Sequence, residues 1–301
     1  MDRLESMALL VAAFEAGSLS AAARRLGIPL ATVSRKVSEL EKHLGLQLFK
    51  RTARRLTPSD AGTAYLAACK RILDEVDEAE RAATGEYRAP KGDLTLNAPI
   101  VLGRLHLVPI VTEFLRAFPD VDVRVVLSDR VSNLPDEAAD AAVRIGELPD
   151  SSMMALRVGT LQRVVCGSPE YFAKRGVPIR PADLRGHDCV TFEAVASHRE
   201  WSFGGPKKAA CVGVRSRLVV NTAEAALDAV TAGLGITRVL SYQTAAAERA
   251  GTLVRVLRPF EPEPIPVNLV YAGHSLIPLK IRAFLDFCAP RLRARLRERA
   301  A

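Results

Sequence analysis

Apolar side chains recur with helical spacing between residues 30 and 44. Their separations of four, three and four positions place them on one face of a helix, and they are Val33, Val37, Leu40 and Leu44. At about 100° per residue, the opposite face carries small, hydroxyl-bearing and cationic side chains. These are Ala31, Arg35, Ser38 and Lys42, with Thr32 and Ser34 beside them. The pattern predicts a helix that packs through one face and leaves a polar, cationic face outward.

Two helices are expected before this one. Residues 3–16 form the first, with one apolar stripe made of Leu4, Met7, Ala8, Val11 and Phe14. Ser18 is expected to cap a short alanine-rich helix over residues 19–26. Left-handed glycines would end the three helices, at Gly17, Gly27 and Gly45. Pro29 fits the first turn of the third helix, because its missing N–H is not needed there.

A short basic hairpin is predicted directly after the third helix. Residues 47–50 and 54–57 are expected to pair as a small wing, and its tip carries Arg51, Arg54 and Arg55. Such cations are suited to phosphates or to a neighbouring minor groove. A helix, a tight turn, an outward-facing helix and a basic wing together favour insertion into a DNA major groove. Helix pairs of this shape also occur in unrelated helical proteins, and a basic hairpin can simply be solvated.

Residues 59–87 read as one long helix without proline. Its apolar positions alternate by four and three residues, which is the spacing of a heptad seam, and they are Tyr65, Cys69, Ile72, Val76, Ala79 and Ala83. The seam predicts a partner helix, most simply from a second copy of the chain. The alternative is that the seam packs against the N-terminal helices of the same chain, the head (residues 1–58). Two heads held in this way would read a two-fold symmetric DNA site. Residues 88–92 (RAPKG) are expected to form a hinge.

After Gly92, predicted strands and helices alternate, which favours a mostly parallel sheet. Strands are expected at residues 94–98, 121–127, 141–145, 163–167, 233–239 and 267–271. An apolar stripe from Leu107 to Phe118 predicts a helix between the first two strands, and Asn221 to Glu224 resembles a capping box before a helix at 222–232. A last helix would run from Pro278 to about Phe287, with the arginine-rich tail as a solvated end. Strands near residues 159–161 and 265–267 would join two α/β lobes.

Composition and the distribution of charge limit the classes of partner that the protein can bind. The 301 residues carry a formal charge of +8, and the positive charge is concentrated in residues 1–58, with ten Lys/Arg against five Asp/Glu. This distribution favours a polyanionic partner. The five cysteines are scattered without CxxC spacing, so we expect no metal site and a reducing cytoplasm. No signal peptide or membrane span is expected.

The sequence contains no catalytic motif of the common hydrolases, proteases or nucleotide-binding enzymes. We therefore expect that the protein is not an enzyme and binds no cofactor. His187, Asp188 and Cys189 are adjacent in sequence, but a loop explains them more simply. An oxidant sensor based on Cys189 and Cys211 is an alternative, although neither has an obvious electropositive neighbour in the sequence.

A ligand site is expected at the carboxyl ends of the predicted strands, where α/β sheets bind small molecules. The first lobe would contribute Asn97, Ala98, Pro99, Ile100, Ser128, Arg144 and Gly146. The second lobe would contribute Asn221, Thr222 and Thr237. Helix N-termini near Ile100 and Thr222 and the cation of Arg144 favour an anion, which we take to be a small carboxylate. A structural salt bridge for Arg144 and simple capping by Asn221 are the alternatives.

The chain resembles LysR-type transcriptional regulators over essentially its whole length. The most specific phrases are GSLSAAARRL, TVSRKVSELEKHLGLQLFKR and RRLTPSDAG, and looser ones follow in order: ADAAVRIGEL, CGSPEYFAKRGVPIRPADL, AGLGIT and GTLVRVL. The resemblance implies an α+β multidomain protein: a winged helix-turn-helix domain (1–58), a linker and dimerisation helix (59–89) and a two-lobed effector domain like periplasmic binding proteins (90–301). Lobe I would span about 91–160 and 267–301, and lobe II about 161–266.

The resemblance also implies roles and partners. Ser34 and Arg35 would contact DNA, with Ala31 and Thr32 at base edges and Arg54 on the wing. Leu30 stands where many members have glutamine, so it would meet a thymine methyl instead of adenine. Partners would be promoter DNA, a small effector and further copies in a homodimer or homotetramer, with RNA polymerase as a possible contact. A solute-binding module with a basic head is the competing interpretation.

Overall fold

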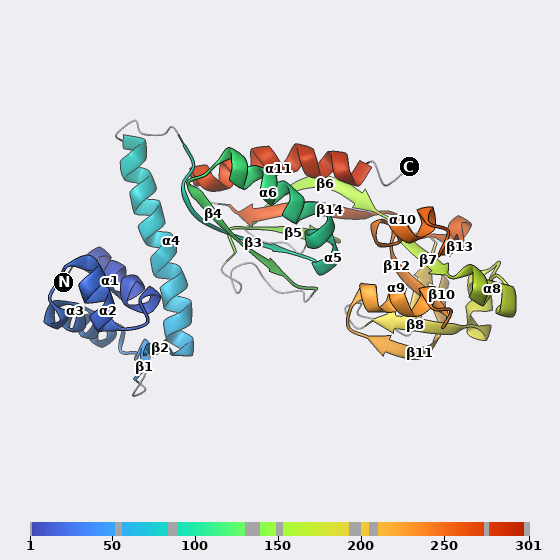
Figure 1. The fold of residues 1–301 in the computed structure, drawn as a ribbon, viewed down its shortest axis with the longest axis horizontal. Coiled ribbons are helices and arrows are strands. Elements are labelled where there is room, and N and C mark those ends of the chain that lie inside the picture. Colours follow the sequence, from blue (N-terminus) through green and yellow to red (C-terminus); the bar gives the residue numbers. More distant parts are fainter. Residues whose placement is uncertain are drawn as a thin grey trace. The chain divides into compact units, whose positions relative to one another are not determined.

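The computed structural model describes residues 2–51, 56–83, 89–129, 139–148, 153–192, 200–204, 210–273 and 277–297 (Figure 1). The chain forms two compact units, Met1–Ala89 and Pro90–Ala301. Arg51, Arg54 and Arg55 belong to the predicted wing tip, and the side chain of Arg51 and all of Arg54 and Arg55 lie outside the described part.

The first unit is a small helical head followed by a long helix. Its elements are α1 (Arg3–Glu15), α2 (Leu19–Leu26), α3 (Leu30–Leu44), β1 (Phe49–Arg51), β2 (Leu56–Pro58) and α4 (Asp60–Ala83). The predicted caps are confirmed: Ser18 Oγ accepts from the N–H of Ala21 at 3.1 Å, and Gly27 and Gly45 are left-handed, with φ of +66° and +67°. Pro29 lies at the N-cap of α3, one position before the first turn.

The predicted apolar stripe of α1 is wrong in its details. Leu4 and Ala8 are exposed, whereas Leu9, Leu10, Ala12 and Ala13 are buried. The helix is apolar on most of its surface, so periodicity alone did not identify the face that α2, α3 and α4 cover. Leu10 and Ala13 pack with Val37, Leu40 and Leu48 in the core of the head.

The hairpin forms, with each strand displaced by one or two residues toward the C-terminus from the predicted ranges. Phe49 pairs with Pro58, Lys50 with Thr57 and Arg51 with Leu56. The N–H of Ser59 donates to the carbonyl of Leu48 at 2.9 Å, and Ser59 Oγ caps α4 by accepting from the N–H of Gly62 at 2.9 Å. The wing is therefore tied directly to the start of α4.

The predicted seam of α4 is used in two ways. Cys69 is buried in the core of the head, together with Leu66, and Tyr65 packs against the same cluster. The first part of the seam thus contacts its own chain, which corrects the expectation that a partner helix covers all of it. Farther along, Ile72 is 37% exposed. Only this later part of the described seam is open to another helix.

The second unit contains two mixed sheets of five strands among the described residues. Lobe I holds β3 (Gly92–Ala98), α5 (Ile100–Leu102), a π-helical turn (Gly103–Leu107), α6 (Val108–Ala117), β4 (Val121–Leu127), β5 (Ala141–Ile145), β6 (Met153–Leu161), β14 (Ile265–Ala272) and α11 (Leu279–Arg297). The strand order is β4-β3-β5-β14-β6. β3 runs parallel to β4 and β5, but β14 is antiparallel to β5 and β6. The ladders are thus not mostly parallel, because β14 returns from lobe II.

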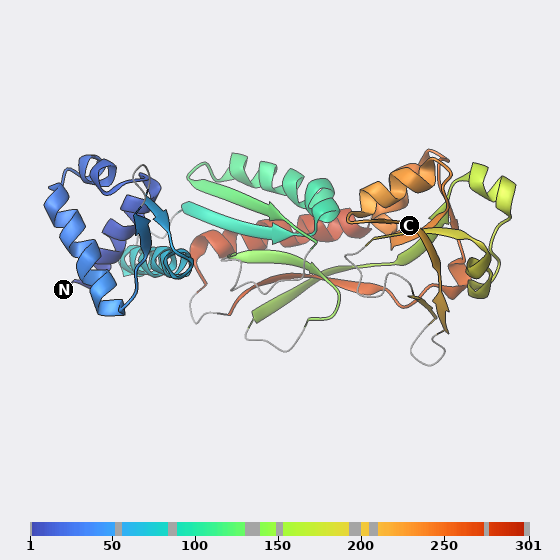
Figure 2. The ribbon, with the colours of Figure 1, turned by 90° about the horizontal axis from the view of Figure 1, so that it is seen from below.

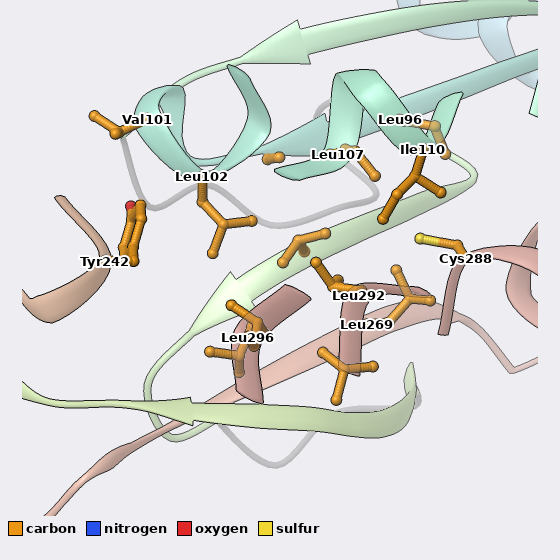
Figure 3. Packing of buried hydrophobic residues seen from close by; sticks show 14 of the residues in the cluster. Leu96, Val101, Leu102, Leu107, Ile110, Tyr242, Leu269, Cys288, Leu292 and Leu296 are labelled. Carbon is orange, nitrogen blue, oxygen red and sulfur yellow. The ribbon is translucent and has the colours of Figure 1, made fainter. Parts of the chain in front are cut away.

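Helices α6 and α11 lie side by side over one face of the lobe I sheet (Figures 1 and 2). The helix predicted to stop near Phe287 continues to Arg297. Leu292 and Leu296 point into the core shared with Leu107 and Leu269 (Figure 3). Up to Arg297, the arginine-rich tail is therefore a packed helix rather than a solvated end, because its leucines share a face although its arginines do not.

Lobe II is built on the sheet β11-β8-β12-β7-β13. Its strands are β7 (Arg163–Gly167), β8 (Asp188–Phe192), β11 (Arg215–Val220), β12 (Ile236–Leu240) and β13 (Val254–Val256), with a hairpin of β9 (Glu200–Phe203) and β10 (Ala210–Gly213). The helices are α8 (Pro169–Arg175), α9 (Ala223–Thr231) and α10 (Ser241–Arg249), and 3-10 turns span Pro181–Gly186 and Arg258–Phe260. α9 and α10 contact one side of the sheet. Tyr171 and Phe172 of α8 and Trp201 of β9 pack into a second core on the other side.

β6 and β14, the strands predicted to join the lobes, both belong to the lobe I sheet and run to the boundary with lobe II. Ile265 pairs with Leu161, and the ladder of β14 and β6 continues from there into lobe I. Among the described residues, no single helix is long and apolar enough to cross a membrane; the bent pair α1 and α2 passes by length and composition only.

Candidate nucleic-acid interface and ligand site

The outward face of α3 has the predicted composition and exposure. Val33, Val37 and Leu40 are buried. The exposed positions are Leu30, Ala31, Arg35, Ser38 and Lys42, and Thr32 and Ser34 are partly exposed between them. Leu30 is 49% exposed, so an apolar side chain stands at the start of a polar surface. The described part of the head leaves this whole face uncovered.

Ion pairs and backbone contacts fix α3 in the head. Lys36 contacts Glu5 of α1, and Glu41 Oε1 accepts from the N–H groups of Leu48 and Phe49 at 2.8 and 3.3 Å. These contacts tie the helix to α1 and to the base of the wing. Arg35 Nη1 lies 3.5 Å from Glu39 Oε1, and both side chains are well exposed. This exposed pair is weak in water, so Arg35 can exchange Glu39 for another anion.

At the edge of lobe I, several predicted ligand residues come together. The register pairs Ala98 with Leu127 and Asn97 with Ala142, so the carboxyl ends of β3, β4 and β5 meet. Arg144 Nη1 donates to Asn97 Oδ1 at 2.6 Å. Ser128 extends the ladder by donating its N–H to the carbonyl of Ala98 at 3.0 Å. Gly146 follows with φ of +114°, and its carbonyl accepts from Asn268 Nδ2 at 3.4 Å.

The helix N-terminus after Pro99 is occupied by the protein's own carboxylate. Ile100 N–H donates to Asp129 Oδ1 at 3.0 Å. The sequence suggested free N–H groups at this end, and the structure corrects that expectation at Ile100. Asp129 had no distinctive signal in the sequence, because the contact joins the start of α5 to a residue 29 positions later in the chain.

In lobe II, the predicted ligand residues separate into different environments. Thr222 is the N-cap of α9, and its Oγ1 accepts from the N–H of Ala225 at 3.3 Å. The third helical position is alanine, so the predicted capping box is absent, and Asn221 is an exposed neighbour of the cap. Thr237 is the second residue of β12, away from the strand's carboxyl end, and its buried Oγ1 has no hydrogen-bond partner among the described residues.

Two contacts between the lobes lie beside this edge and were not predicted. Arg104 Nη2 lies 3.1 Å from Glu224 Oε1. The ring of His106, in the π-helical turn, meets the ring of Tyr242 edge-on, with centroids 5.7 Å apart. Burial, followed by the nearby charge of Asp129, raises the pKa of Tyr242 above its ordinary value. Figure 3 shows Tyr242 facing Leu102 across the lobe boundary.

The two buried cysteines of lobe II, Cys166 and Cys189, do not form a ready redox pair. Cys166 aligns with Thr237, and Cys189 aligns with the neighbouring Ile236. Adjacent positions of a strand face opposite sides of a sheet, and the two thiols accordingly lie in different cores. Burial raises the pKa of each to about 12, which disfavours the reactive thiolate. Cys211, the other half of the predicted pair, is exposed.

No group of three or more His, Cys, Asp or Glu side chains in the described part of the chain could hold a metal ion. His187 and Asp188 also have structural roles. His187 Nδ1 lies 3.2 Å from the hydroxyl of Tyr171, and Asp188 forms ion pairs with Arg215 and Arg217. The predicted loop is therefore wrong for Asp188 and Cys189, which begin strand β8, and His187 lies directly before that strand.

Comparison with known proteins gives two family matches. Residues 4–63 match the bacterial regulatory helix-turn-helix protein family of the lysR type, and residues 88–293 match the LysR substrate binding domain. An HTH-type transcriptional regulator of Xanthomonas campestris pv. campestris is 34% identical over 293 residues, covering 96% of this chain and 85% of the relative. An HTH-type transcriptional repressor of Pseudomonas aeruginosa is 33% identical, covering 95% and 91%.

Solved structures agree with these matches. CrgA, a LysR-type transcriptional regulator from Neisseria meningitidis, has a TM-score of 0.62 at 29% identity, covering 96% of this chain and 98% of that one. The Vibrio cholerae virulence activator AphB has a TM-score of 0.60 at 25% identity, covering 95% and 98%. The chain therefore belongs to the LysR family of transcriptional regulators, which are not enzymes, and it combines an N-terminal helix-turn-helix DNA-binding domain with a C-terminal effector-binding domain.

Proposed function

We propose that this regulator reads promoter DNA through the outward face of α3 and responds to a small organic anion bound at the carboxyl edge of lobe I. The observation that carries the DNA-reading part is the segregation of α3. Its valines and Leu40 are buried, while the face from Leu30 to Lys42 is uncovered in the described head. Because promoter DNA lies in the bacterial cytoplasm, this function implies a cytoplasmic protein.

Different residues of this face contact different parts of the DNA. Arg35 donates to base edges or phosphates, with Ser34 and Ser38 beside it and Ala31 and Thr32 at the bases. Leu30, exposed at the start of the helix, contacts a thymine methyl, since it lacks the amide that would pair with adenine. Arg51, Arg54 and Arg55 of the wing contact phosphates or the adjacent minor groove.

Two copies of the chain pair through the later part of the α4 seam. Ile72 is exposed there, whereas Cys69 is already covered by the head. Two heads then reach successive major grooves of a pseudo-palindromic site. Further pairing of the C-terminal domains gives a tetramer, and a change in the angle between heads alters DNA bending and the recruitment of RNA polymerase.

The effector part of the proposal rests on Arg144 and Asn97. Asn97 is 1% exposed, and its side-chain oxygen orients the guanidinium of Arg144. A guanidinium held in this way recognises a carboxylate well. Ser128, Gly146, Ala98 and Pro99 lie at the same carboxyl edge of the sheet. Asp129, which occupies the N–H of Ile100, disfavours an anion directly at that helix end, so Arg144 is the principal cation of the site.

A gel-shift measurement tests the DNA-reading part. The full-length protein is mixed with the DNA upstream of its own gene and with an unrelated duplex of equal length. We expect tighter binding to the upstream DNA and a linear fall of log affinity with log salt, whose slope counts phosphate contacts. Failure to bind either duplex at low salt would contradict the proposal and favour a solute-binding module.

Calorimetry tests the effector part separately. The full-length protein is titrated with small mono- and dicarboxylates and with uncharged analogues of the same size. We expect saturable binding of at least one acid and none of its amide analogue. Tighter binding of the neutral analogues would contradict an anionic effector and leave the DNA-reading proposal intact.

A further inference from the structure

Two arginines lie next to each other on lobe II, apart from the predicted ligand edge. Arg238 of β12 pairs with Val165 of β7, and Leu240 pairs with Arg163. Arg163 and Arg238 are therefore diagonal neighbours on adjacent antiparallel strands, with backbone positions about 7–8 Å apart. Strand alternation places both on the same side of the sheet.

The surroundings of Arg238 hold it in one orientation. Its Nη1 donates to the carbonyl of Ser202 at 3.1 Å. Its guanidinium lies over the ring of Trp201, 5.4 Å from the ring centroid. The β9–β10 hairpin thus positions the guanidinium through a carbonyl and an aromatic face, neither of which removes its charge.

Neither arginine has a carboxylate partner among the described residues. Other arginines of the same lobe do have one. Arg255 forms a bidentate contact with the carboxylate of Glu261. Arg217 Nη1 lies 3.1 Å from Asp188 Oδ2. Burial lowers the pKa of Arg163, and burial together with the charge of Arg163 lowers the pKa of Arg238 to about 10. Two partly buried like charges on neighbouring strands destabilise a sheet unless an anion offsets them.

We propose that Arg163 and Arg238 form a binding site on lobe II for a small oxyanion, either a carboxylate or a phosphate group. Two guanidiniums at this separation present N–H donors to a single tetrahedral or planar oxyanion. This site differs from the proposed effector site because it needs no residue of lobe I, and because Thr237 and Cys166 face the opposite side of the sheet. Arg163 is the first residue of β7 and is separated from the end of β6 at Leu161 by Gln162 alone, so a bound anion lies close to the crossover between the lobes.

The position of the single tryptophan makes the proposal directly testable. The chain has one Trp, and Trp201 lies beneath the guanidinium of Arg238. Its fluorescence therefore reports on this site and not on phosphate bound at the DNA-binding head. Full-length protein is titrated with inorganic phosphate and, separately, with acetate, with sodium chloride at matched ionic strength as the control.

We expect a saturable change in Trp201 emission with phosphate, acetate or both, and none with chloride. In Arg163→Gln the affinity should fall about tenfold or more, since a charge-assisted contact is lost. Arg185→Gln removes an equal charge from an exposed position of the same lobe and should bind like the parent. A chloride response equal to the others, or equal affinity in Arg163→Gln and the parent, would overturn the site.

A second variant keeps the test decisive if Arg163→Gln does not fold. Arg163→Lys retains the charge and loses the planar donor fork. We expect it to fold and to bind the anion several-fold more weakly than the parent protein. Parental affinity in Arg163→Lys would also count against the proposal.

Discussion

Arg144 donates to Asn97 across 2.6 Å, and this hydrogen bond joins two neighbouring strands of lobe I at their carboxyl ends. Asn97 is almost fully buried, and Arg144 is partly exposed. The pair thus consists of a fixed acceptor and a cation that is oriented by it. This relationship supports the proposed preference of the lobe I edge for a negatively charged ligand.

Replacing the acceptor should therefore weaken effector binding without removing the cation. In Asn97→Ala we expect the affinity for the best carboxylate to fall about tenfold, because Arg144 is no longer oriented. Calorimetry of the full-length protein measures this change. Arg124→Gln, an exposed charge change on β4 of the same lobe, serves as the control. Unchanged affinity in Asn97→Ala would assign the pair a purely structural role.

Arg35→Ala should weaken specific DNA binding by roughly 1–3 kcal/mol if the side chain reads a base. The loss should be larger on the selected site than on unrelated DNA. Competition gel shifts at fixed salt measure both affinities. Arg71→Ala removes a charge from an exposed position of α4 and should affect both duplexes slightly and alike. An equal loss on both duplexes in Arg35→Ala would indicate a phosphate contact instead.

Gly62→Ala should destabilise the junction between the wing and α4. A β-carbon at Gly62 would lie 1.9 Å from the carbonyl oxygen of Leu48, which itself accepts from the N–H of Ser59. The backbone would have to shift, at a cost of about 1–3 kcal/mol or more. Thermal unfolding measures the loss. Gly186→Ala, where nothing lies within 4 Å of the added carbon, should melt like the parent.

Leu296→Ala should destabilise lobe I although it lies close to the end of the chain. The side chain is 4% exposed, and it fits against Gly159, where a β-carbon would lie 2.9 Å from its Cδ1. A buried leucine truncated to alanine costs about 2–5 kcal/mol. The exposed neighbour Arg297→Ala should have little effect in the same denaturant titration. Equal stability of the two variants would show that the tail does not pack.

The stability of the head should depend on pH through Glu15. A hydrogen bond from Lys70, followed by the charge of Lys70 and the contact with Arg25, lowers the pKa of Glu15 below the ordinary value of a glutamate. Lys70 Nζ lies 2.8 Å and Arg25 Nη2 3.2 Å from the carboxylate. A carboxyl with a lowered pKa stabilises the folded state above its unfolded value, and this contribution disappears as the pH falls through the folded pKa.

Glu15→Gln should therefore melt at a lower temperature than the parent at pH 7. The difference should shrink as the pH drops below about 4.5, because the parent then loses the same charge. Melting curves from pH 7 to pH 3 measure the trend. Glu80→Gln, an exposed change on α4, provides the baseline. A difference that stays constant with pH would assign the effect to packing instead of charge.

The sequence predicted the features that depend on neighbouring residues. The caps at Ser18, Gly27 and Gly45, the buried face of α3 and the alternation of strands and helices after Gly92 all agree with the structure. Each depends on spacing within a few residues, where helix periodicity and backbone conformation leave few alternatives. Asn97 and Arg144 were predicted to share an edge for a similar reason, since the carboxyl ends of parallel strands meet.

By itself, then, the sequence determined the helices of the head, most strands of lobe I and the face of α3 that carries the polar groups. The tertiary structure decided which distant residues pack against the other faces of the helices and strands. In the folded chain, Cys69 packs in the core of the head, whereas Ile72 stays exposed. Leu296 is buried in the core of lobe I. Asp129 accepts a hydrogen bond from the N–H of Ile100. The fold also sets Arg163 beside Arg238. These contacts join residues distant along the chain, and local periodicity carries no information about which distant surface is the partner.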